Sequence, residues 1–242
     1  MELVLLFVYS YLVGSVPTAY IIGRLVRGID IREYGSGNVG GSNIFEHVGR
    51  QWIIPLGFFE VFFKGASPVW VGIWLLDVQV EGPTGVWTAN FLMGFDRSTP
   101  ALAIASLLSI AGHNWPIFLK FQGGRGIGTA AGGLLAMAFY QLWIFIAIGL
   151  PGYFVRRSAV MVLTSLLLLP VWTILLGQSM VVVWYCFGMI GIIVLRRLTA
   201  NGKPKVSGYS TTKVLFNRLV RDRDVDDRDE WVTREPNSAK ES

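Results

Sequence analysis

Residues 127–155 read IGTAAGGLLAMAFYQLWIFIAIGLPGYFV and contain no charged side chain. Basic residues flank this stretch at both ends: Arg125 precedes it, and Arg156 and Arg157 follow it. Because basic residues concentrate in cytoplasmic loops, both ends are expected on the cytoplasmic side. About 29 residues are too few for two full spans of about 20 each. The stretch therefore predicts two short helices with a turn near 139–141, and a single tilted span is the alternative.

The composition of the whole chain is that of a membrane protein. Of its 242 residues, 52% are hydrophobic and 15% are charged, and the mean hydropathy is +0.51. A soluble domain carries about a quarter charged residues. Five further apolar stretches are long enough to cross a bilayer. They cover residues 3–25, 52–76, 98–119, 158–177 and 179–198.

Counting both short helices, the sequence predicts an all-α polytopic membrane protein with seven transmembrane helices, two of them short. Basic residues are dense after the first span and after residue 198, whereas the loop at 77–97 is poor in them. The positive-inside rule therefore places the N-terminus outside and the C-terminus in the cytoplasm. If 127–155 is a single span, the count is six and every later segment changes side.

Charge density divides the chain into two parts. Residues 1–205 form the expected membrane domain, and residues 206–242 form a charged cytoplasmic C-terminal tail. The tail contains the mixed-charge run DRDVDDRDE at 222–230, which is typical of a solvated helix or a disordered extension. Contact with an unidentified partner is the alternative role for the tail.

Two glycine-rich polar turns fall on the cytoplasmic side in this topology. The first is GSGNVGGSN at 35–43, and the second is KFQGGRGIGT at 120–129. Glycine allows backbone to approach a ligand closely, and successive backbone N–H groups form concave anion sites. Arg125 in the second turn could hold a phosphate or a carboxylate at two points. The turns therefore predict a phosphate site, and flexible polar loops are the alternative.

Lys64 lies near the middle of an apolar run. A lysine at that depth is costly unless it faces the protein interior or water. We expect Lys64 to add positive charge to the phosphate site from within the helices. The alternative is a side chain that reaches toward water near a helix break at Gly65 and Pro68.

Other chemistries find no support in the sequence. The single cysteine, Cys186, lies in an apolar run, and the two histidines are far apart, so no metal site is predicted. No serine lies in a Gly-x-Ser-x-Gly elbow, which argues against a serine hydrolase. The net charge of +5 suits anionic lipid headgroups or phosphorylated substrates better than nucleic acid. No cofactor is expected.

Three motifs, in order, resemble those of the bacterial membrane glycerol-3-phosphate acyltransferases that use acyl-phosphate (PlsY type). They are the first turn at 35–43, the segment KGASP at 64–68, and GHNWP at 112–116 followed by residues 121–129. The similarity runs from residue 1 to about 205. It implies seven membrane helices with an external N-terminus, in the cell inner (plasma) membrane. It also implies that acyl-phosphate and glycerol-3-phosphate, or a related phosphorylated alcohol, react to give lysophosphatidic acid for phospholipid biosynthesis.

The resemblance also implies site residues. Catalytic roles fall on His113 and Arg125, although a structural role for His113 at a helix end is equally open. Phosphate- or substrate-binding roles fall on Ser36, Gly37, Asn38, Gly40, Ser42, Asn43, Lys64, Gly123, Gly124, Gly126, Thr129, Arg196, Arg197 and Asn201.

The chain departs from the family pattern at several of these positions. Glu46 stands where the first motif has an arginine, and Arg125 stands where the second motif has a lysine. Glu60 replaces the usual aspartate before the Lys-Gly segment. Ser158, Ala159 and Val160 occupy a place where the family has a tyrosine and then a serine. The third-motif region, 196–201, has no histidine, so no catalytic base is assigned.

Two further hypotheses stand beside an active acyltransferase. One is a non-catalytic relative that binds an anionic lipid or a phosphorylated ligand, which Glu46 and the missing histidine favour. The other is a small transporter, since helices broken at glycine turns also suit ion pathways.

Overall fold

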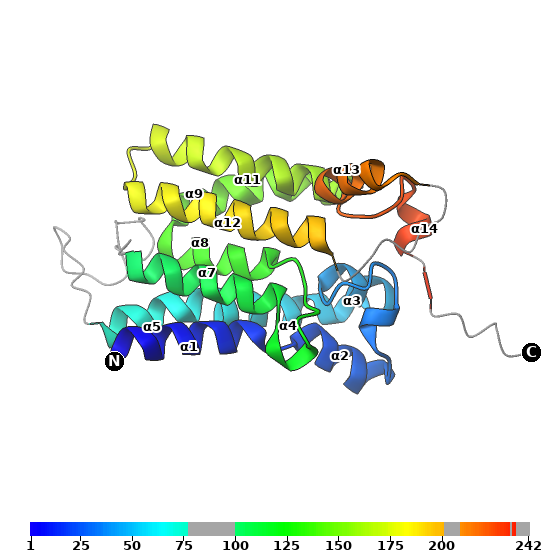
Figure 1. Cartoon of the computed structure of the whole chain (residues 1–242), viewed down its shortest axis with the longest axis horizontal. Helices are drawn as coiled ribbons and strands as arrows, with labels where there is room; N and C mark the ends of the chain where they lie inside the picture. The colour runs from blue at the N-terminus through cyan, green and yellow to red at the C-terminus, as the bar shows by residue number, and fades with distance from the viewer. Residues whose placement is uncertain (77–99, 201–208, 233, 236–242) are drawn as a thin grey trace, which may run out of the picture.

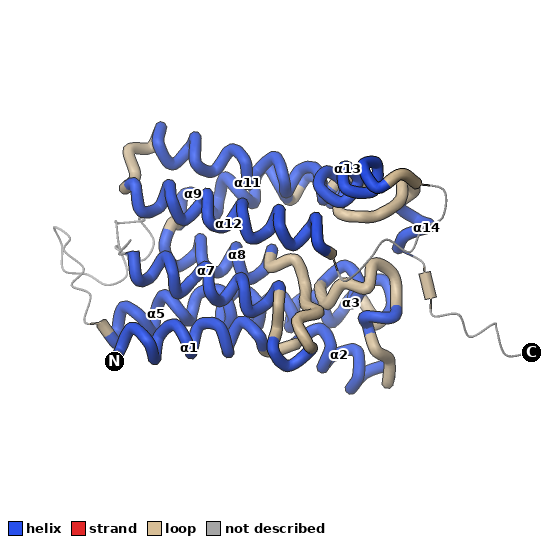
Figure 2. Tube along the Cα trace, in the orientation of Figure 1, coloured by secondary structure: helices blue, strands red, loops and turns tan. Residues whose placement is uncertain are grey.

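The computed structural model describes residues 1–76, 100–200, 209–232 and 234–235. Within these residues the chain forms helices joined by loops, and the long helices lie side by side in one bundle (Figures 1 and 2). The predicted external loop at 77–97 and the candidate residue Asn201 lie outside the described residues. The helices of the first half are α1 (Glu2–Ser15), α2 (Thr18–Arg27), α3 (Gly41–His47), α4 (Ile53–Phe58), α5 (Ser67–Leu75) and α7 (Pro100–Asn114). Those of the second half are α8 (Ile127–Met137), α9 (Phe139–Gly149), α10 (Pro151–Phe154), α11 (Ser158–Leu175), α12 (Met180–Thr199), α13 (Thr211–Arg221) and α14 (Arg228–Val232).

Five helical segments of the described chain are long and apolar enough to cross a membrane. Two short apolar helical segments, Ile127–Met137 and Phe139–Phe154, accompany them. The long segments are Glu2–Arg27, Arg50–Leu75, Pro100–Leu119, Ser158–Leu175 and Met180–Thr199. Large apolar side chains on the bundle surface, such as Val4, Trp74 and Trp184, are more than half exposed, as lipid-facing residues would be.

The prediction of two short helices within 127–155 is confirmed. The break lies at Ala138, one residue before the predicted turn. Gly126 and Ile127 at the start of the stretch line the same cavity as Ser158, just after its end. The stretch therefore enters the bundle and returns to the end at which it began. The total of seven spans and the sidedness of the termini stay predictions.

A π-helical segment, η3 (Phe59–Ala66), joins α4 to α5 and packs against α8. Its backbone approaches α8 closely through two glycines. A Cβ on Gly65 would lie 2.3 Å from the Thr129 carbonyl oxygen, and one on Gly132 would lie 2.0 Å from that of Val61. Small residues allow membrane helices to pack this closely. As a result Lys64 is 2% exposed, so the alternative of a side chain reaching to water is wrong.

Helix α13 folds back onto α11 and α12 (Figure 1), whereas α14 contacts α3, where Nε2 of His47 lies 2.9 Å from the Val232 carbonyl oxygen. We call residues 209–232 the C-terminal segment. The prediction that its mixed-charge run is a solvated helix or a disordered extension is wrong at Asp224, which is only 5% exposed. Asp224 accepts hydrogen bonds from Arg218 at 2.6 and 3.1 Å. This pairing offsets the cost of burying both charges.

Candidate functional site

The two glycine-rich turns are in contact at one end of the bundle. The backbone N–H of Val39 in the first turn donates to the carbonyl of Gly123 in the second, at 3.5 Å. Figure 2 shows these loops together near α3, at the end where the C-terminal segment also lies. The sequence separates the two turns by about eighty residues, so this contact is the central element of the predicted site.

Asn43 shapes the first turn. Its side-chain amide donates to the carbonyls of Ile31, Tyr34 and Asn38 at 3.3, 2.9 and 3.0 Å. Its oxygen accepts from the backbone N–H and the hydroxyl of Ser36 at 3.4 and 3.3 Å. Asn43 therefore uses its polar atoms on the chain itself.

One polar atom of the first turn is still without a partner. The side-chain oxygen of Asn38 is buried and accepts no hydrogen bond. Buried polar atoms are almost always paired, so an unpaired one needs an explanation. Asn38 also borders two cavities, and a bound ligand with a hydroxyl or another donor would satisfy it.

The loop that precedes the first turn is fixed by charge. Asp30 accepts hydrogen bonds from the Arg32 side chain at 2.9 and 2.6 Å and from the Arg32 backbone at 3.1 Å. The Arg32 guanidinium holds the pKa of the Asp30 carboxyl below its usual value. This pair anchors the loop beside α2, outside the membrane-spanning segments.

Behind the turns, three buried side chains form one charged group. The Nζ atom of Lys64 lies 2.7 Å from Glu60, and Nδ1 of His113 lies 2.7 Å from the other Glu60 oxygen. Lys64 Nζ is 3.3 Å from His113 Nδ1, and Thr129 donates to Glu60 at 3.1 Å. Glu60 was absent from the predicted site, although its spacing of four residues before Lys64 in an apolar helix could have indicated the pair. Lys64 is therefore a neutralised cation.

The second turn leaves no room for side chains at its glycines. A Cβ on Gly124 would lie 2.0 Å from Nε2 of His113 and 2.6 Å from the Val39 carbonyl oxygen. Gly124 also donates its N–H to the His113 carbonyl at 3.1 Å. These glycines let the turn press against α7 and against the first turn.

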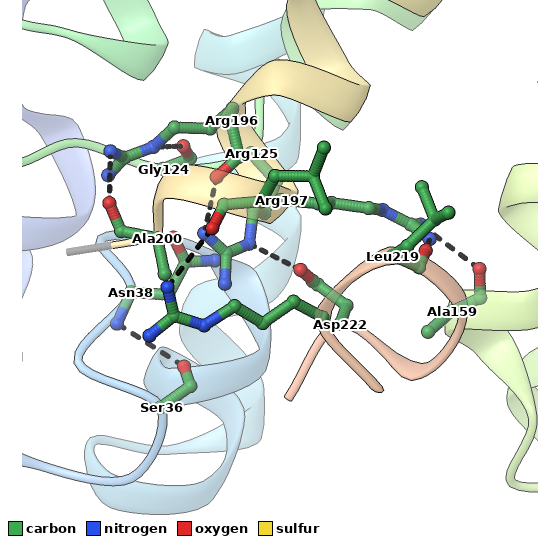
Figure 3. A network of polar contacts seen from close by, with 12 residues as sticks. Ser36, Asn38, Gly124, Arg125, Ala159, Arg196, Arg197, Ala200, Leu219 and Asp222 are labelled. Carbon is green, nitrogen blue, oxygen red and sulfur yellow. Dashed lines mark hydrogen bonds and ion pairs between the residues drawn. The ribbon is translucent and has the colours of Figure 1, made fainter. Parts of the chain in front are cut away.

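Arg196 on α12 holds the second turn in place. It donates to the carbonyls of Gly124 and Ala200 at 2.9 and 2.8 Å (Figure 3). It also donates to the carbonyl of Gly123 at 2.7 Å. Its neighbour Arg197 donates to Leu219 of the C-terminal segment at 2.9 Å and to Ala159 at 3.0 Å. Both arginines are 2% exposed, and their guanidinium groups donate to backbone carbonyls. They position loops and helices, a use that the sequence pattern did not indicate.

Arg125 projects from the second turn toward the C-terminal segment. Its Nε atom lies 2.6 Å from Oδ1 of Asp222, and one terminal nitrogen donates to the Arg196 carbonyl at 3.4 Å (Figure 3). Asp222 was also missing from the predicted site, because no local pattern at residue 222 indicates a contact with residue 125. The charge of Arg125 is thus paired within the chain.

Two neighbouring cavities open at this end of the bundle. The smaller, about 350 Å³, is lined by polar residues that include Asn38, Ser42, His113 and Arg125. Apolar residues, among them Ile53, Leu56, Ile127 and Val162, also line it. The larger, about 450 Å³, lies between the first turn, residues 156–160 and the C-terminal segment. Asn38, Ser42, Ser158, Ala159 and Asp222 border both.

The structure thus gathers most of the predicted residues at one place. Those that line at least one of the two cavities are Ser36, Asn38, Gly40, Ser42, Asn43, His113, Arg125, Gly126 and Arg197. Lys64, Gly123 and Gly124 surround a much smaller space beside them. Gly37, Thr129 and Arg196 line none of these three cavities. Within the described part of the chain, no group of three or more His, Cys, Asp and Glu could hold a metal ion.

Comparison with known proteins identifies the family of the chain. Residues 4–206 match the family model described as glycerol-3-phosphate acyltransferase. The chain is 35% identical to glycerol-3-phosphate acyltransferase 4 of Dehalococcoides mccartyi strain CBDB1, over 96% of this chain and 94% of that protein. It is 32% identical to glycerol-3-phosphate acyltransferase 5 of strain ATCC BAA-2266, over 99% of this chain and 96% of that protein. Both matches therefore extend well beyond residue 206.

A solved structure has the same fold. It is the glycerol 3-phosphate form of PlsY (YgiH), an integral membrane glycerol 3-phosphate acyltransferase. The TM-score is 0.68 at 23% sequence identity, over 89% of this chain and all of the other. The likeness supports the arrangement of helices described above.

Proposed function

We propose the mechanism of this chain from the premise that it belongs to the glycerol-3-phosphate acyltransferase family. It is a multi-pass membrane enzyme that transfers an acyl group to glycerol-3-phosphate in phospholipid synthesis. The finer proposal is that the acyl donor is an acyl-phosphate. The family membership rests on the match over residues 4–206 and on relatives that align with nearly the whole chain.

One observation supports the placement of the reaction: the cavity of about 350 Å³ is lined by both polar and apolar side chains. Arg125, His113 and Asn38 are among the polar lining residues, where a phosphate and a hydroxyl would bind. The apolar lining residues offer a surface for an acyl chain. Such a cavity suits a lipid-soluble donor and a polar acceptor that meet at a membrane surface.

We assign roles according to which atoms are available. Arg125 would bind the phosphate of the acceptor or the departing phosphate, because its planar group pairs with phosphate oxygens. The unpaired oxygen of Asn38 would accept a hydrogen bond from a substrate hydroxyl. Ser42 would add a hydroxyl donor, whereas the hydroxyl of Ser36 donates to Asn43 and would help to shape the first turn. Asn43, Arg196 and Arg197 would act by shaping the turns, since their polar groups are bound to backbone.

The proposed reaction requires the protein mainly to orient the two substrates. The 1-hydroxyl oxygen of glycerol-3-phosphate attacks the acyl carbonyl carbon, and a new ester C–O bond forms. The bond from that carbon to the phosphate oxygen breaks, and phosphate leaves with the electron pair. The hydroxyl proton passes to the departing phosphate, so no side chain has to act as base. Orientation of the two substrates and electrostatic stabilisation of the developing charge supply the acceleration.

The topology that accompanies this mechanism is also a proposal. Seven membrane helices, with the N-terminus outside and the C-terminus in the cytoplasm, would place both glycine-rich turns at the cytoplasmic face of the plasma membrane. The basic residues around the site support this side. Residues 1–205 would then form the acyltransferase domain and residues 206–242 a cytoplasmic extension.

The test is an acyl transfer assay with purified protein. Acyl-phosphate and glycerol-3-phosphate are supplied, and lysophosphatidic acid and phosphate are measured for the wild type, Arg125→Ala and Ser36→Ala. We expect product from the wild type and a loss of at least about tenfold in kcat/KM for Arg125→Ala. Product formation from acyl thioesters but not from acyl-phosphate would refute acyl-phosphate as the donor. A wild-type kcat/KM in Arg125→Ala would refute the placement of the reaction at this cavity.

A further inference from the structure

The C-terminal segment places a carboxylate against the arginine of the site. Oδ1 of Asp222 lies 2.6 Å from Nε of Arg125 (Figure 3). The Arg125 side chain is 8% exposed, and that of Asp222 is 23% exposed. Asp222 borders both the smaller and the larger cavity, so its carboxylate stands between them.

The position of Asp222 is fixed by the folding of the segment. It follows the last residue of α13 and has a left-handed backbone with φ +55°. Four residues earlier, Arg218 pairs with Asp224 and donates to the Leu198 carbonyl of α12 at 3.0 Å. Arg197 of α12 in turn donates to Leu219. Buried arginines therefore fix the residues before and after Asp222 in the chain: Arg197 binds Leu219, and Arg218 binds Asp224.

The contact between Arg125 and Asp222 is close but poorly aligned. Arg125 Nε and Asp222 Oδ1 are buried, and neither has a hydrogen-bond partner with acceptable geometry. The pair thus has Coulomb attraction without the directional part of a charge-assisted hydrogen bond. A phosphate monoester carries close to two negative charges and three acceptor oxygens, so it can bind a guanidinium better than this carboxylate does.

We propose that Asp222 is an internal competitor for the phosphate group of the acceptor. Its carboxylate occupies Arg125 in the free enzyme, and a phosphate monoester displaces it toward the larger cavity. The larger cavity can receive the displaced side chain because Arg157, Arg221 and Arg223 line it. Asp222 thereby sets the affinity for phosphorylated ligands, and the C-terminal segment is part of the substrate site. This inference rests on the proposed role of Arg125 in phosphate binding.

The test compares the full-length wild type with Asp222→Asn. Asparagine removes the charge and tolerates the left-handed backbone, so the segment keeps its conformation. The measurements are KM for glycerol-3-phosphate and the inhibition constant for inorganic phosphate. Both are expected to fall by about fivefold in Asp222→Asn, the effect of losing a partly exposed ion pair that competes with the ligand. The matched control is Glu235→Gln, which removes an exposed carboxylate that lines neither cavity and should change neither constant.

Two further variants make the outcome decisive. Asp222→Gly also keeps the left-handed backbone, and it replaces Asp222→Asn if that protein has a lowered melting temperature. In an Arg125→Ala background, removing the Asp222 charge should leave both constants unchanged, because the competition needs the guanidinium. Constants that stay the same or rise in Asp222→Asn, while Arg125→Ala is impaired, overturn the inference alone. Unimpaired phosphate binding in Arg125→Ala overturns the proposed role of Arg125 itself.

Discussion

Nδ1 of His113 lies 2.7 Å from Oε2 of Glu60, and both side chains are less than a tenth exposed. The second oxygen of Glu60 lies 2.7 Å from Nζ of Lys64. A single carboxylate therefore orients the histidine that borders the cavity and neutralises the lysine beneath it. We infer that Glu60 is a positioning residue, which fixes the ring of His113 against the second turn.

Replacement of Glu60 by alanine should be strongly destabilising. It leaves the buried Lys64 ammonium without its counter-charge, a loss of about 3–5 kcal/mol in known cases. Thermal unfolding in detergent should show a markedly lower melting temperature than for Glu33→Ala, whose carboxylate is exposed. The double variant Glu60→Leu with Lys64→Met removes both charges and should recover much of the loss. A double variant less stable than Glu60→Ala alone would show that the charge pair is not what holds this region.

Arg196→Lys should impair the enzyme although it keeps the positive charge. Arg196 donates to three carbonyls, and the compact ammonium of lysine cannot reproduce this planar arrangement. The buried Gly124 carbonyl would lose its guanidinium partner, and a buried carbonyl left unpaired costs about 1–3 kcal/mol, so the second turn should loosen. We expect kcat/KM to fall at least about tenfold. Arg50→Lys, at an exposed arginine, should retain wild-type kinetics, and an equal effect in both variants would argue against the turn-holding role.

The helix bundle could be predicted from the sequence because the features that predict it, segment length and flanking basic residues, are local in the chain. Basic residues on both sides of 127–155 and the length of this stretch were enough to predict the pair α8 and α9. Their physical basis, membrane thickness and charge placement, does not depend on tertiary contacts. The π-helical geometry of Phe59–Ala66 had no comparable signal, because it depends on how the segment packs against α8.

The sequence predicted that the two turns lie at one end of the bundle, but it did not predict the contacts among their side chains. The glycines of the two turns predicted a phosphate site, and the turns do touch. The hydrogen bonds from Arg196 to the turn carbonyls depend on the fold of α12. The ion pair between Asp222 and Arg125 depends on the fold of α13. The sequence does not show whether the guanidinium group of an arginine binds substrate or backbone. Only the three-dimensional structure separates these uses.

The Asp30–Arg32 pair predicts a specific acid sensitivity. Because hydrogen bonds from Arg32 lower the pKa of Asp30, the pair stabilises the fold at pH values above the unfolded pKa of about 4. This contribution is lost as the pH falls through the lower folded pKa. Asp30→Asn should thus melt below the wild type at pH 7, and the difference should shrink under acid conditions. A difference in melting temperature that is constant between pH 7 and pH 3 would refute this origin.

Gly124→Ala should abolish activity through packing alone. The added methyl group would lie 2.0 Å from Nε2 of His113 and 2.6 Å from the Val39 carbonyl, so either the histidine or the first turn must move. Since both border the cavity, we expect kcat/KM to fall by about a hundredfold or more. Gly191→Ala is the matched control, because its methyl group would meet nothing within 4 Å on the exposed face of α12. That variant should retain activity and be slightly more stable, by about 0.5–1 kcal/mol. If Gly124→Ala retains wild-type kinetics, the two turns do not need the close contact seen here.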